Sequence, residues 1–289
     1  MKTLKTFLPL VTGLLVLSSC GGGASKGNTS GGTSTPASNI SNAEAAEEFA
    51  QMKQNYQAID TDLNEDDFSY FGWSINTELD NEVSKSSFEI SLAEKYYTNT
   101  TYMDNASSTF MHLDEEAREE YEVTQIYHNY QYTSHLYINS KQELARWSKT
   151  TGYITYTPSK YKETEFETGE VHESIDETDA ELAEMKFMNQ YHNSFGSMKN
   201  YWKQYSEICF STFESYLSMP VSMVNCYSSG PGHLALSFSL MGMTYACEFK
   251  NGYLSYLLTD FDYSKMGTPI SSIDGHTRVK NYQTFEFVK

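Results

Sequence analysis

Hydrophobic and polar residues alternate along the last third of the chain, and this alternation predicts a three-stranded antiparallel meander. Strands are expected at 234–240 and 243–249, with a third strand following Asn251-Gly252. Asn-Gly is a strong signal for a two-residue hairpin, and Met241-Gly242 is a second candidate turn. With both turns two residues long, the paired apolar side chains share one face: Leu236, Phe238, Tyr245, Tyr256 and Leu258.

Period-two patterns upstream predict further strands, and a last strand ends the chain. Asp80-Asn81 is expected to form a turn. The predicted ranges are 68–79, 86–103, 121–140, 153–156 and 282–288.

Three-to-four spacing of apolar residues predicts helices. The first runs over 43–59 with Asn42 as its cap. The stretch 178–217 reads as two helices divided at Gly196, starting from a capping box at Thr178 and Glu181. The acidic stretch 114–122 is expected to be a short exposed helix.

The N-terminus has the features of an export signal. Lys2 and Lys5 precede an apolar run over 7–17, which is too short to span a bilayer as a mature helix. The sequence Leu17-Ser18-Ser19-Cys20 closely resembles the lipobox of bacterial lipoproteins. That resemblance implies a signal peptide at 1–19 and a lipid on Cys20. It also implies a protein anchored on the extracytoplasmic face of the cell membrane, in a monoderm or a diderm host.

The residues after Cys20 are rich in Gly, Ser and Thr, so 20–42 is predicted to be the lipidated cysteine with a flexible tether. The remaining 43–289 is long enough for a single α+β domain, which we expect to be monomeric.

Charge and composition limit the classes of partner that this protein is expected to bind. A formal net charge of −18 repels phosphate backbones and anionic headgroups, so we expect no nucleic-acid binding. Aromatic residues make up 15% of the chain, which favours strands with one face in water.

Three cysteines remain if Cys20 carries lipid: Cys209, Cys226 and Cys247. At most one bridge can join them, and the sequence leaves open whether two of them pair. Their apolar neighbours favour free, buried thiols.

Motifs for catalysis, cofactors or metals are missing from the sequence, so we expect a binding protein without cofactor or metal, not an enzyme. Asp60, Asp62 and Asn64 fit the start of a calcium loop. However, Glu65 stands where Gly is needed and Phe71 where the bidentate Glu belongs.

A helix, antiparallel strands, a helical insertion and a final meander, in this order, resemble the LolA, LprG and LppX lipoprotein-carrier superfamily. That resemblance implies a curved antiparallel sheet, an open half-barrel packed against helices, with an apolar cavity for a lipid or another apolar ligand. In such a cavity the five meander residues would contact the ligand: Leu236, Phe238, Tyr245, Tyr256 and Leu258.

Two other functions stay open. The first is a cell-surface module without a cavity that recognises protein or glycan through aromatic side chains, either Trp73 with Phe71 and Tyr70, or the Tyr-rich segment 127–137. Cross-strand packing explains the same aromatics. The second is an extracellular hydrolase that uses a carboxylate pair.

Overall fold

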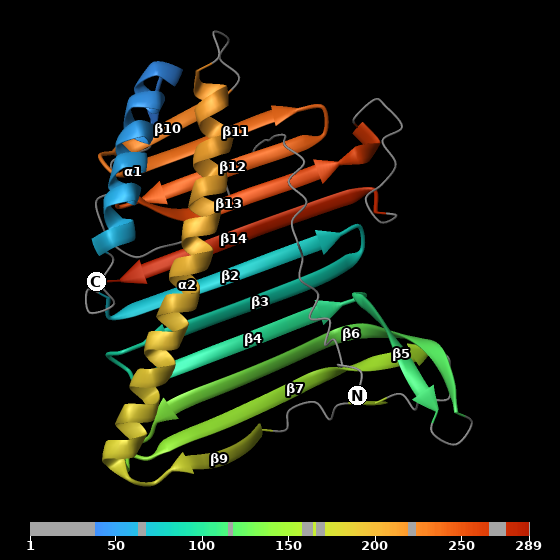
Figure 1. Cartoon of the computed structure of the whole chain (residues 1–289). Coiled ribbons are helices and arrows are strands. Elements are labelled where there is room, and N and C mark those ends of the chain that lie inside the picture. Colours follow the sequence, from blue (N-terminus) through green and yellow to red (C-terminus); the bar gives the residue numbers. More distant parts are fainter. Residues whose placement is uncertain are drawn as a thin grey trace.

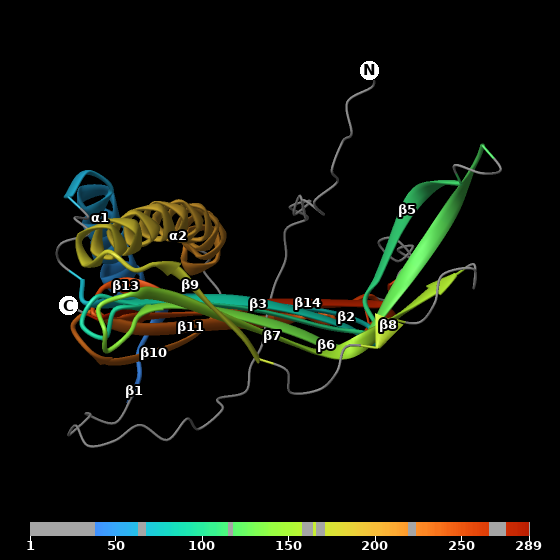
Figure 2. The same cartoon turned by 90° about the horizontal axis from the view of Figure 1, so that it is seen from below.

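The computed structural model describes residues 38–62, 68–114, 118–157, 164–165, 171–218, 224–265 and 276–288. In this part of the chain, 14 strands form one antiparallel sheet that does not close on itself. Two helices, α1 and α2, lie on the same face of the sheet (Figures 1 and 2). The expected large antiparallel sheet carrying helices is therefore confirmed, with a larger share of strand than an α+β domain suggests.

The element bounds are as follows. The helices are α1 (Asn42–Asp62) and α2 (Ala180–Leu217), and a 3-10 turn spans Tyr263–Lys265. The first nine strands are β1 (Ser38–Asn39), β2 (Tyr70–Leu79), β3 (Glu82–Ser91), β4 (Tyr96–Asp104), β5 (Ser107–Asp114), β6 (Glu119–Ile138), β7 (Leu144–Thr157), β8 (Thr164–Glu165) and β9 (Val171–Glu177). The last five are β10 (Val224–Gly230), β11 (His233–Leu240), β12 (Met243–Lys250), β13 (Tyr253–Asp262) and β14 (Arg278–Val288).

The strand order is β1-β10-β11-β12-β13-β14-β2-β3-β4-β6-β7-β8, with β5 pairing β6 and β9 pairing β7. Most neighbours in space are neighbours in sequence, as in any meander. The exception that unites the sheet is the β14–β2 pair, which joins the C-terminal meander to the N-terminal strands over ten residue pairs from Val279↔Leu79 to Val288↔Tyr70.

Helix α2 crosses the sheet as one continuous element of 38 residues, about 57 Å long. In spatial order, the ten neighbouring strands β11-β12-β13-β14-β2-β3-β4-β6-β7-β9 span about 43 Å. One oblique helix can therefore cross them all. The predicted break at Gly196 is wrong: Gly196 is exposed, and nothing lies within 4 Å of the position a Cβ would take. The cap is Asp179, whose carboxylate accepts from the Glu181 and Leu182 amides at 3.0 Å, in place of the predicted Thr178.

The domain starts earlier than predicted. Residues 38–42, assigned to the tether, belong to the fold because β1 pairs with β10 and Ser41 caps α1. The Ser41 hydroxyl accepts from the Glu44 amide and the Glu44 carboxylate accepts from the Ser41 amide, a capping box that replaces the predicted cap at Asn42.

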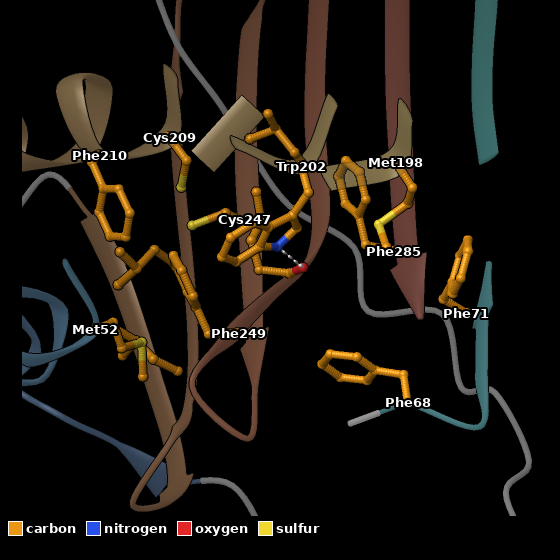
Figure 3. Packing of buried hydrophobic residues seen from close by; sticks show 14 of the residues in the cluster. Met52, Phe68, Phe71, Met198, Trp202, Cys209, Phe210, Cys247, Phe249 and Phe285 are labelled. Carbon is orange, nitrogen blue, oxygen red and sulfur yellow. Dashed lines mark hydrogen bonds between the residues drawn. The ribbon is translucent and has the colours of Figure 1, made fainter. Parts of the chain in front are cut away.

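The core lies between the two helices and the sheet (Figure 3). Phe49 of α1 and Phe210 of α2 both pack on Phe249 of β12, with ring centroids 5.9 and 5.8 Å from it. The indole of Trp202 donates to the Leu254 carbonyl at 3.2 Å, which fixes α2 to β13. Of the predicted stripe on α1, Phe49 and Met52 are buried, while the side chains of Tyr56, Ile59 and Leu63 lie outside the described residues.

Cys209, Cys226 and Cys247 are free and buried, as the sequence favoured. Burial raises the pKa of the Cys226 thiol to about 11, so this thiol stays protonated at neutral pH.

The meander forms with both predicted turns, but its third strand is out of the predicted register. Leu240 pairs with Met243 across Met241-Gly242, and Lys250 pairs with Tyr253 across Asn251-Gly252. A β-bulge then leaves Ser255 unpaired, because Phe249 faces Leu254 while Glu248 faces Tyr256.

Past the bulge, the pairing is shifted by one residue. Cys247 pairs with Leu257, and Tyr245 pairs with Thr259. Tyr256 and Leu258, expected beside Cys247 and Tyr245, therefore lie on the opposite face of the sheet.

The structure corrects three further expectations from the sequence. The range 86–103 is two strands, β3 and β4, joined by a turn before Tyr96. The expected helix at 114–122 is wrong, because Asp114 ends β5 and Glu119–Glu122 begin β6. The expected short strand at 153–156 is the end of the longer β7.

One end of the sheet bends sharply toward the side of the helices where β5 pairs with β6 (Figure 2). Three residues with positive φ lie there: Asn105 between β4 and β5, Asn129 in β6, and Gly152 in β7. Gly152 has φ +80°, and a Cβ at this position would lie 2.3 Å from the Asn129 carbonyl oxygen. The bend thus requires glycine at this position.

Gly152→Ala should lower the free energy of unfolding by about 1–3 kcal/mol, because the new methyl group meets backbone in a strained conformation. Gly196→Ala is the matched control: in an exposed helix interior it should raise the free energy of unfolding by about 0.5–1 kcal/mol. Urea denaturation measures both. Equal effects of the two substitutions would contradict the bend described here.

The bulge predicts that truncating two adjacent leucines lowers the free energy of unfolding by different amounts. Leu257→Ala should cost about 2–5 kcal/mol, since Leu257 is 4% exposed under the helices. Leu258→Ala should cost about 1 kcal/mol or less. Thermal and urea melts of the two variants give the comparison, and a larger loss at Leu258 would restore the unbulged register.

Candidate ligand-binding groove

The two faces of the sheet have different surroundings. One face packs against α1 and α2, and no described helix or strand packs on the opposite face, which we call the open face (Figure 2). Strand alternation assigns residues to it: in β2, Phe71 and Trp73 face the helices, whereas Ser74 is bonded on the open face to Thr284.

A groove of about 340 Å³ is hollowed across the middle of the open face. It crosses β2, β3, β4 and β6. Every lining residue carries a polar group, although carbon atoms form most of the exposed lining surface; the residues are Ser74, Asn76, Lys85, Ser86, Ser87, Thr100, Tyr102 and Gln131.

Asn76 is the most unusual residue of the groove. The residue as a whole is only 8% exposed, while its amide atoms keep contact with solvent and have no hydrogen-bond partner among the described residues. An amide offers two donors and an acceptor, and here these groups belong to the lining of the groove instead of bonding a protein partner. Ser87, directly across the strand pair from Ser74, likewise has no hydrogen-bond partner in the described part of the chain. The groove therefore offers free donors and acceptors to a ligand.

The register of four strands brings these residues together. Asn76 pairs with Lys85, Lys85 with Tyr102, and Tyr102 with Gln131, which places one side chain per strand along the groove. The Tyr102 hydroxyl donates to the Asn129 amide oxygen at 3.2 Å, so the bend at Asn129 holds this ring in place.

Stacked rings lie on the open face of β4, β6 and β7, beyond the residues that line the groove. His135 stacks between Tyr96 and Trp147, with centroids 5.5 and 5.3 Å away. The Thr98 hydroxyl lies 2.6 Å from His135 Nδ1. Burial lowers the pKa of His135 despite the nearby Glu89 carboxylate, so the ring is neutral at neutral pH.

Both signs of charge lie near the groove. The Lys85 ammonium lies 5.5 Å from the centre of the Tyr102 ring, and Lys280 is paired with Glu78 at 3.0 Å. Burial, assisted by the Asp104 carboxylate, raises the pKa of Tyr102. This phenol is therefore a hydroxyl donor over the whole neutral range.

The residues predicted to bind a ligand are divided between the two faces. Leu236, Phe238 and Tyr245 share one face, as expected. Each is at most 3% exposed, in the core between the sheet and the helices. The Phe238 ring stacks on Tyr216 at 4.3 Å, and Tyr245 meets the edge of Phe213. These three side chains are part of the packed core.

Tyr256 and Leu258 lie on the open face beyond one end of the groove. Tyr256 pairs with Thr284, and Leu258 pairs with Tyr282. The Tyr256 and Tyr282 rings are 6.5 Å apart.

The predicted aromatic platforms are also divided. Phe71 packs on Tyr191, and Trp73 stacks on Tyr201 at 4.7 Å, so both belong to the helix interface. Tyr70 lies on the open face, where its hydroxyl donates to Glu89. Within 127–137, His135 and Tyr137 lie on the open face, next to Trp147 and Glu173.

Sequence reasoning missed the groove itself. The alternation of 68–79 does show that Ser74 and Asn76 share a face opposite Phe71 and Trp73. It does not show which residues of three other strands lie beside them.

The described residues hold neither a cluster of metal-binding side chains nor a membrane-spanning helix. Among these residues, no group of three or more His, Cys, Asp or Glu side chains could hold a metal ion. None of the helices described is both long enough and apolar enough to cross a membrane. Cys20 and the signal sequence lie outside the described residues.

No protein-family model matches this chain. No curated protein matches it either. Among solved structures, it is similar to a porin-like protein from Bacteroides uniformis at 12% identity and a TM-score of 0.18, with 76% of this chain and 96% of that chain covered. A likeness at this TM-score supports no statement on fold or function.

Proposed function

We propose that this protein is a membrane-anchored lipoprotein that binds a neutral glycan in the groove of the open face. The observation that carries the proposal is the Asn76 amide, which has no hydrogen-bond partner among the described residues and lines a groove whose residues all carry polar groups. A ligand that supplies hydroxyl groups would satisfy this amide together with Ser87.

Three features favour a sugar over other polar ligands. The groove presents hydroxyls and amides, which match the alternating donors and acceptors of a sugar. The Tyr102 ring lines it, and such a ring supplies contact area together with a polar edge. The net charge of −18 disfavours an anionic ligand, because the field of the whole chain repels it.

The alternative of an apolar ligand in a half-barrel cavity stays a prediction, with less support. It relied on Leu236, Phe238 and Tyr245 lining a void, and these side chains pack against aromatic rings of α2. The residues that line the groove carry hydroxyl, amide and ammonium groups, and an apolar ligand would cover these without pairing them.

The anchor part of the proposal rests on the lipobox resemblance at Cys20. A diacylated N-terminus followed by a Gly/Ser/Thr-rich tether would hold the domain near the membrane surface without a transmembrane helix.

Asn76→Ala should weaken glycan binding by about tenfold, because one or two hydrogen bonds of about 1 kcal/mol each are lost. The full-length protein in detergent is tested on an array of neutral hexose, pentose and N-acetylhexosamine oligosaccharides. Calorimetry then measures the affinity for the glycan bound best. The same substitution should leave the melting temperature unchanged or raised, since the amide has no partner to lose.

Asn225→Ala is the matched control, because Asn225 is exposed on the open face of β10, several strands from the groove. It should change neither affinity nor stability. Wild-type protein that binds no oligosaccharide on the array overturns the glycan proposal. A large fall in stability of Asn76→Ala with unchanged binding would make Asn76 a structural residue.

Cys20→Ala should release the protein from membranes into the soluble fraction, because the acyl chains alone are expected to hold it there. Ser19→Ala keeps a small residue before the cysteine and should stay with the membrane. Fractionation after a high-salt wash measures both. A Cys20→Ala protein that still pellets would disprove the lipid anchor.

A further inference from the structure

The floor of the groove is a row of small hydroxyl residues that is longer than the groove lining itself. Thr284, Ser74, Ser87, Thr100 and Thr133 are direct cross-strand partners on β14, β2, β3, β4 and β6. Four strand spacings separate the ends of this row, which makes it about 19 Å long. We call these five residues the hydroxyl row.

Larger side chains border the hydroxyl row on both sides. On one side they come two residues further along each strand: Tyr282, Asn76, Lys85, Tyr102 and Gln131. On the other side the same five strands carry Glu286, Gly72, Glu89, Thr98 and His135, and the Tyr70 hydroxyl lies over Gly72. A strip of small side chains between two rows of larger ones is a channel that runs across the strands.

Beyond each end of the hydroxyl row, the next cross-strand partner has a larger side chain, which closes the channel. Tyr256 pairs with Thr284 at one end, and Lys149 pairs with Thr133 at the other. The channel therefore has a defined length of five strands.

The hydroxyls of the row keep capacity for a ligand. Ser74 and Thr284 Oγ atoms are 2.6 Å apart, and those of Thr100 and Thr133 are 3.3 Å apart. A hydrogen bond between two hydroxyls uses one of their two protons, so each pair retains one donor. With Ser87 between the pairs, donors are spaced along the whole channel.

Resting on the proposed function, we infer that the ligand is a linear, neutral polysaccharide chain that lies across the strands along the hydroxyl row. A single sugar would fill the part beside Asn76 and leave the hydroxyls near Thr133 and Thr284 in water. Several units of one chain would contact the row from end to end.

The test is a length series of the glycan bound best on the array, prepared as single unit, dimer, tetramer and hexamer. Calorimetry with the full-length protein should show affinity rising by about tenfold or more from the single unit to the tetramer, as hydrogen bonds accumulate. The hexamer should gain little more, because Tyr256 and Lys149 end the channel.

Variants at the two ends of the hydroxyl row distinguish binding of a long chain along the row from binding of a single sugar unit. Thr133→Val and Thr284→Val should each weaken the tetramer by about 2–10-fold and leave the single unit unchanged. Thr244→Val, on the open face away from the row, is the control and should change neither. Equal affinity at all lengths would overturn the polymer inference while the glycan function stands. Failure to bind any length would overturn both.

Discussion

The covering of a very wide sheet by only two helices is the constraint on which the structure depends. An antiparallel sheet remains stable with one face in water, provided that the other face is buried. Here the buried area is the strip under α1 and α2, and Trp202 and Tyr191 fix α2 to it by hydrogen bonds to the Leu254 and Phe68 carbonyls. The length of α2 follows from this role, because a shorter helix would leave apolar strands uncovered.

The open face must then be built from residues that tolerate water and still stabilise strands. Thr and Tyr meet both demands, because β-branched and aromatic side chains favour strands while their hydroxyls stay solvated. This accounts for the 23 tyrosines and for the Ser/Thr partners across neighbouring strands. The hydroxyl row fits the same demand, and it becomes a channel because larger side chains border it on both sides.

Sequence alone was enough for much of the fold, and local chemistry explains which part. Asn251-Gly252 and Met241-Gly242 fix their hairpins, since turn type and register are set within a few residues. The bulge at Ser255 has no comparable signal, and it moved Tyr256 and Leu258 to the other face. The groove needs the register of four strands at once, which depends on every intervening turn, so no local pattern could identify it.

Asn76 shows why the groove is best explained as a site. Its amide lines the groove with two donors and an acceptor and bonds no other described residue, whereas a Ser or Thr at the same strand position would present fewer polar groups. Asn is also depleted in strands, where β-branched and aromatic residues are favoured. Departures from local consistency are expected where function opposes stability. The Asn76 amide, which bonds no other described residue, is thus the group of the groove that a hydroxyl-rich ligand can pair with most fully.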